Sequence, residues 1–103
     1  METTPAALHE QLLDARSRLE QAWDATEDDA ARVAIVDQMA EIDRQIMRLV
    51  ADQIDQHTAA FRQAAAAVGE ANAKLASALA EAEGIAAAVE TVARAVRLVA
   101  ELI

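Results

Sequence analysis

The chain has 103 residues, of which 54% are hydrophobic and 26% are charged, and its formal net charge is −9. Alanine accounts for 28 residues, whereas only two residues are aromatic, two are glycine and one is proline, so strands and tight turns have little support. The absence of cysteine excludes disulfides and thiolate chemistry. We therefore predict one all-α domain that spans residues 1–103.

Acidic residues are concentrated in the first half of the chain. Residues 1–56 contain 13 Asp or Glu and five Arg, whereas residues 57–103 contain five Glu and four Lys or Arg. Nucleic-acid binding requires clustered cations that displace counterions from phosphates, and neither half has such a cluster. We expect no nucleic-acid partner, and an anionic membrane surface is disfavoured for the same reason.

The two ends of the chain predict a cytoplasmic protein. The N-terminal residues lack the basic and apolar regions of a signal peptide. The most apolar stretch, residues 85–103, contains Glu90, Arg94, Arg97 and Glu101, and each of these costs about 2.5–3.5 kcal/mol at mid-membrane. A spanning helix is therefore not expected, although reversible binding of this stretch to a membrane surface is a third and weaker hypothesis.

The first predicted helix covers residues 5–25. Thr4 and Pro5 have the residue types of an N-cap and a first helical position. One apolar stripe follows at steps of three and four residues: Leu8, Leu12, Ala15, Leu19 and Ala22. We expect Trp23, beside this stripe, to anchor the helix against the rest of the fold, with a binding hot spot as the alternative. Thr26 and the acids after it predict the start of a second helix.

The second segment, residues 27–56, is the acidic part of a predicted long helix. Its stripe of Ile35, Met39, Ile42 and Ile46 is interrupted near residues 50–57 and resumes at His57 and Phe61. Ile46 and His57 are eleven residues apart, so one hendecad interrupts the heptad pattern, which is a stutter in a coiled coil.

A regular heptad pattern fills residues 57–103. With His57 at position d, thirteen of fourteen a and d positions are apolar and every charged residue falls at b, c, f or g. We call the fourteen a and d positions the heptad seam. Its large members are Phe61, Val68, Leu75, Ile85, Val89, Val92, Val96, Val99 and Ile103, and its close-packing alanines are Ala64, Ala71 and Ala78.

Two glycines lie on the outer side of this pattern. The heptad phase passes through both Gly69 and Gly84, and a glycine inside a helix costs only about 1 kcal/mol. We therefore predict one helix over residues 27–103, about 115 Å long, with a break at Gly84 as the alternative. The short N-terminal helix would fold back on it.

A helix of this length cannot bury its own apolar stripe. The heptad seam therefore predicts a homo-oligomer. Its β-branched C-terminal part favours trimers or tetramers over parallel dimers. The alternative is a core formed within one chain, but large side chains are scarce in so short a chain.

No motif for catalysis, cofactors or metals stands out, and we expect no enzyme activity and no cofactor. The first hypothesis for function is a homo-oligomeric coiled-coil scaffold or adaptor. The second is a small acidic inhibitor or antitoxin-like accessory protein that binds a basic protein surface. The acids that would form such a partner face are Asp28, Asp29, Asp37, Glu41, Asp52 and Asp55.

Overall fold

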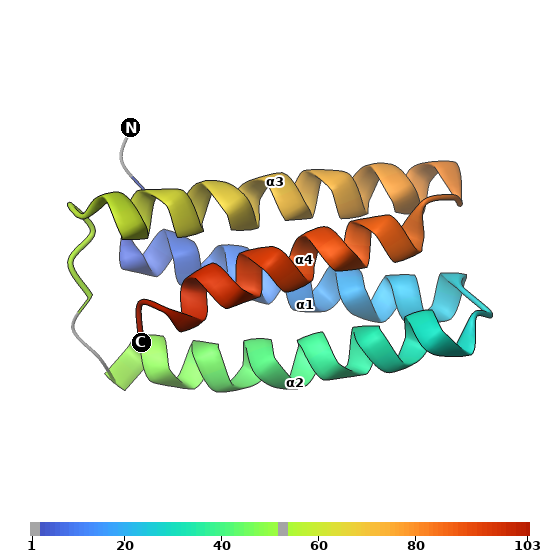
Figure 1. Ribbon diagram of the computed structural model, residues 1–103, viewed down its shortest axis with the longest axis horizontal. Coiled ribbons are helices and arrows are strands. Elements are labelled where there is room, and N and C mark those ends of the chain that lie inside the picture. The colour runs from blue at the N-terminus through green and yellow to red at the C-terminus, as the bar shows by residue number, and fades with distance from the viewer. Residues whose placement is uncertain (1–2, 52–53) are drawn as a thin grey trace.

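Four α-helices run up and down along a common axis in the computed structural model, which describes residues 3–51 and 54–103 (Figure 1). They are α1 (Pro5–Ala25), α2 (Asp29–Ala51), α3 (Ala59–Glu81) and α4 (Ile85–Ala100). The bundle measures 39 × 25 × 17 Å along its principal axes. The all-α class is confirmed, and the described residues contain no strand.

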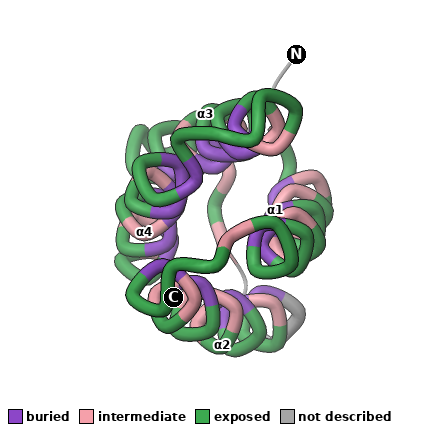
Figure 2. The backbone as a smooth tube through the Cα atoms, turned by 90° about the vertical axis from the view of Figure 1, so that its right-hand side faces the viewer, coloured by how far each residue is buried: buried purple, intermediate pink, exposed green. Residues whose placement is uncertain are grey.

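The end-on view shows the helices at the corners of a square (Figure 2). α1 packs against α2 and α3, and α4 packs against the same two helices from the opposite corner. α1 and α3 run in one direction, whereas α2 and α4 run in the other. The link from α2 to α3 therefore crosses the diagonal, and the other two links are short turns at one end of the bundle.

Side-chain hydroxyls and carboxylates define where the helices begin. The Thr4 hydroxyl accepts a hydrogen bond from the amide of Ala7 at 3.1 Å, and Pro5 occupies the first turn, as predicted. Thr58 caps α3 in the same way, through the amide of Phe61 at 3.1 Å. α2 begins two residues later than predicted, at Asp29.

The single helix predicted over residues 27–103 is wrong. α2 ends at Ala51 and α3 starts at Ala59, so the predicted stutter coincides with a chain reversal, of which residues 52–53 lie outside the described part. The helix continues through Gly69, as predicted. It stops at a second turn in which Ala82 and Gly84 both have left-handed backbone conformations, with φ of 55° and 77°.

Most of the heptad seam is buried within one chain, whereas His57 and Ala82, which also occupy seam positions, are exposed. Phe61, Leu75 and Val99 are fully buried. The other seam residues of the described core are Val68, Ile85, Val89, Val92, Val96, Ala64, Ala71 and Ala78, with Ile103 packed at its edge. α1 and α2 cover them with the leucines and isoleucines of their own stripes. The seam therefore needs no second chain to remove it from water.

Two buried amides hold helices together across this core. The Gln45 amide donates a hydrogen bond to the backbone carbonyl of Val96 at 2.8 Å, which joins α2 to α4. The Asn72 amide donates to the carbonyl of Gln11 at 3.0 Å, which joins α3 to α1. The side-chain oxygens of Gln45 and Asn72 are buried without a hydrogen-bond partner. A buried oxygen without a partner costs free energy, so each of these side chains also destabilises the helix contact that its amide nitrogen forms.

Candidate functional site

Large apolar side chains that are exposed lie, among the described residues, only on α1 and α2. They are Leu13, Trp23, Val33, Val36 and Met47, with exposed fractions between 39% and 73%. We call these five residues the α1–α2 outer face. The exposed large apolar side chains of the described residues are therefore confined to the first half of the chain, which makes it the candidate binding surface.

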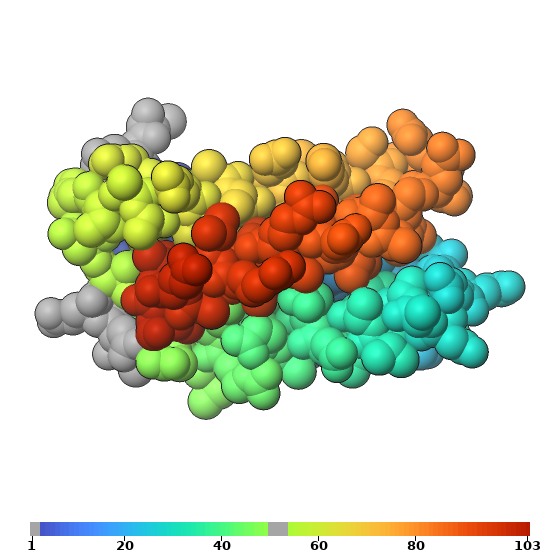
Figure 3. All heavy atoms as spheres, in the orientation of Figure 1, coloured from blue at the N-terminus to red at the C-terminus, as the bar shows by residue number. Residues whose placement is uncertain are grey.

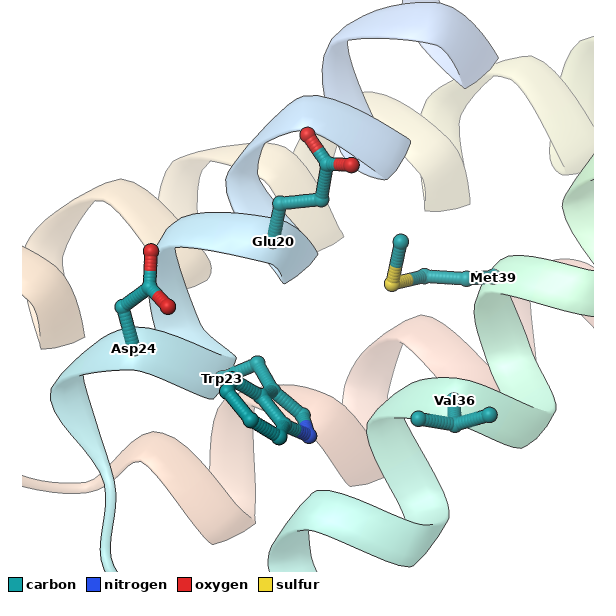
Figure 4. Close-up of a pocket in the computed structure, with 5 residues that line it drawn as sticks. All are labelled: Glu20, Trp23, Asp24, Val36 and Met39. Carbon is teal, nitrogen blue, oxygen red and sulfur yellow. The ribbon is translucent and has the colours of Figure 1, made fainter.

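Trp23 lines two depressions on this face. It forms a wall of one depression of about 460 Å³, together with Glu20, Asp24, Val36 and Met39. In Figure 4 the indole projects from α1 toward α2, and the Met39 side chain enters the same space from α2. A second depression, of about 450 Å³, is also lined by Trp23 and Val36. Trp23 and Val36 thus belong to the walls of both depressions.

Arg32 fixes the position of this indole. Its guanidinium carbon lies 4.2 Å from the centroid of the Trp23 ring, within the range of a cation–π contact. Its Nε donates a hydrogen bond to the backbone carbonyl of Thr26 at 2.8 Å. One side chain therefore ties the start of α2 to both the end of α1 and the turn between them. The predicted anchoring role of Trp23 is only partly met, because 39% of the residue is exposed.

The rim of the two depressions is acidic. Four carboxylates line them, those of Glu20, Asp24, Asp29 and Asp37, against the one guanidinium of Arg32. Both short turns of the bundle lie at this end of the molecule (Figure 1). The turns add further carboxylates at Glu27, Asp28 and Glu83. An apolar surface with such a rim attracts cationic groups and repels anionic ones.

An ion pair joins α1 and α2 farther along the same side. Arg16 donates through Nε to the Asp43 carboxylate at 2.6 Å and reaches Glu20 on its own helix at 3.2 Å. The hydrogen bond to Asp43 raises the pKa of the Arg16 guanidinium above its ordinary value. The pair sits between the Trp23 depressions and the other end of the hairpin, so the outer face has a polar middle.

The six acids predicted as a partner face do not form one surface. Asp29 and Asp37 line the second Trp23 depression. Asp28 accepts a hydrogen bond from the amide of Ala30, and Glu41 pairs with Arg44 at 2.6 Å. Asp55, at the other end of α2, accepts from the amide of His57 at 2.8 Å. Asp52 lies outside the described residues.

A second shallow groove runs between α2 and α4, on the face shown in Figure 3. One part of it, of about 330 Å³, is lined mainly by alanine. The other part, of about 610 Å³, is lined by charged residues of both helices, among them Glu41, Arg44 and Arg97. The groove presents no large exposed apolar residue, so it offers less apolar surface to a partner than the α1–α2 outer face.

The described residues contain no group of three or more His, Asp or Glu side chains arranged to hold a metal ion. None of the helices found in them is long and apolar enough to cross a membrane. No protein-family model matches the chain, and the searches of curated proteins and of solved structures found no similar protein.

The valines and the methionine of the α1–α2 outer face were not among the predicted site residues. Val33, Val36 and Met47 lie outside the apolar stripe of α2, which passes through Ile35, Met39, Ile42 and Ile46. Large apolar residues that remain once a core stripe has been assigned are the sequence signal for such a face.

Proposed function

We propose that this chain is a non-catalytic protein-binding module that recognises a basic partner through the α1–α2 outer face. The observation that carries the proposal is an exposed tryptophan beside two exposed valines, with four carboxylates around them. Tryptophan surrounded by a polar rim is typical of binding hot spots. The acidic rim supplies electrostatic attraction and discrimination between partners.

This proposal corresponds to the second of the two functional hypotheses, the acidic accessory protein. The first, a homo-oligomeric scaffold, was based on a seam that would need other chains to cover it. Because one chain covers the seam, burial of the seam gives no reason for an oligomer.

Site-specific photo-crosslinking tests the proposal in an extract of the source organism. A photoreactive amino acid replaces Val33, on the outer face, and in a matched control it replaces Ala73, an exposed residue of α3. We expect crosslinks from position 33 to a protein rich in Lys and Arg, and we expect added salt to reduce them. Equal crosslinking from position 73, or crosslinks from position 33 only to another copy of this chain, would contradict the proposal.

A further inference from the structure

We infer that the α1–α2 outer face receives an amphipathic helix of the partner, with apolar residues along one side and Lys or Arg beside them. The inference rests on the proposed function and specifies the shape and chemistry of what binds. It follows from the length of the face, from the spacing of its apolar residues and from the distribution of its charges.

The face extends along most of the helical hairpin. The Arg16–Asp43 ion pair fixes the register of α1 against α2, and the shared depression of Glu20 and Met39 follows the same register. One further turn in that register brings Leu13 level with the part of α2 that carries Met47. Trp23 and the two valines thus form one apolar end of the face, and Leu13 and Met47 form the other.

The spacing of residues on α2 is that of a helix-packing surface. Val33, Val36, Ala40, Asp43 and Met47 follow one another at steps of three, four, three and four residues. Four of these positions are apolar, and the remaining one, Asp43, is paired with Arg16. The spacing is that of the heptad repeat by which one helix packs along another. The 14 steps from Val33 to Met47 span about 21 Å, so a helix of four turns would cover them. Helix-in-groove recognition uses anchors with this spacing.

The charges of the Trp23 end select a basic helix. The Trp23 end is lined by four carboxylates and one guanidinium, and the Arg16–Asp43 pair leaves the middle neutral. The Met47 end lies beside Arg44 and Arg48 of α2. The cationic residues of the bound helix therefore gather over Trp23, and its apolar residues reach both ends of the face.

Two designed peptides of about 18 residues test this inference, both made of leucine and lysine in the same proportions. One has its leucines at steps of three and four, and the other has them in strict alternation. Trp23 is the chain's only tryptophan, so its fluorescence reports binding at this face directly. We expect the first peptide to bind at least tenfold more tightly and to become helical on binding, as circular dichroism would show.

The variant Met47→Ser removes the distal anchor without altering the charge, and Ala73→Ser on α3 is the matched control. We expect Met47→Ser to weaken binding of the first peptide about fivefold and the control to leave it unchanged. Equal affinity of the two peptides, or an unchanged affinity of Met47→Ser, would overturn the helix-in-groove inference while leaving a basic partner in place. Binding of neither peptide, together with failure of the crosslinking at position 33, would overturn the proposed function as well.

Discussion

The guanidinium of Arg32 lies over the indole of Trp23, 4.2 Å from the ring centroid, and is the one cation among the four carboxylates that line the two depressions. This contact holds the indole in place, but it also puts a positive charge where a basic partner would bind. Arg32 therefore stabilises the free protein and opposes the proposed complex.

The variant Arg32→Gln separates these two effects. We expect it to lower the free energy of unfolding by about 0.5–1 kcal/mol, because the cation–π contact is lost. We also expect it to bind the helical leucine–lysine peptide about threefold more tightly, because a like charge has been removed. Urea unfolding and a titration followed by Trp23 fluorescence measure the two quantities. Weaker binding by this variant would show that Arg32 contacts the partner favourably.

Gly69 and Gly84 should respond in opposite ways to replacement by alanine. Gly69 lies inside α3, where an added Cβ would meet only Gln11 Nε2 at 3.8 Å, an ordinary contact. Gly69→Ala should therefore raise the free energy of unfolding by about 0.5–1 kcal/mol. Gly84 has a φ of 77° in the α3–α4 turn, so Gly84→Ala should lower it by about 1 kcal/mol. Chemical denaturation compares the two variants, and a gain of stability in Gly84→Ala would contradict the turn.

Replacing the buried Gln45 tests the cost of its unpaired oxygen. Gln45→Leu removes the hydrogen bond to Val96 and also removes a buried acceptor that has no partner. Because an unsatisfied buried group costs about 1–3 kcal/mol and a leucine would fill a similar volume, we expect a gain of about 1 kcal/mol. Gln45→Ala, which leaves a cavity, should be less stable than the original chain. Thermal unfolding of both variants would test this, and a large loss in Gln45→Leu would contradict it.

Burial of the heptad seam within one chain predicts the effect of a core substitution and the dependence of the melting temperature on protein concentration. Phe61→Ala should lower the free energy of unfolding by about 3–5 kcal/mol, because Phe61 is fully buried in the core. Val33→Ala, on the outer face, should change it by less than about 0.5 kcal/mol. The melting temperature of the original chain should not change with protein concentration. A melting temperature that rises with concentration would show that folding depends on assembly.

Periodicity predicted which residues are buried but not which helix covers them. Phe61, Leu75 and Val99 were placed in the seam by their spacing, and all three are buried. The heptad phase also crosses the turn at Ala82–Gly84 without interruption, because Ala78 and Ile85 are seven residues apart whether or not the helix is continuous. A phase that survives a turn carries no signal of the turn, so the two helices were predicted as one. The break at Gly84, which was given as the alternative, is where the turn lies.

The arrangement of the six predicted acids in space could not be derived from their spacing. The acids of α2 were expected to gather on one side, yet Asp29 and Glu41 lie on different sides of the helix, in contact with different depressions. Spacing alone does not say which side of α2 faces α1 and which faces α4. The exposed Val33 and Met47 could have been recognised as residues that the core stripe leaves out.

The most direct test of the binding surface is a map of backbone amide chemical shifts by NMR as the helical leucine–lysine peptide is added. The protein's 103 residues make it small enough for such spectra. We predict changes concentrated at Leu13, Trp23, Val33, Val36 and Met47 and at the acids of the Trp23 depressions, with the exposed side of α3 unaffected. Changes centred on α3 and α4, or spread evenly over the bundle, would contradict the α1–α2 outer face as the binding site.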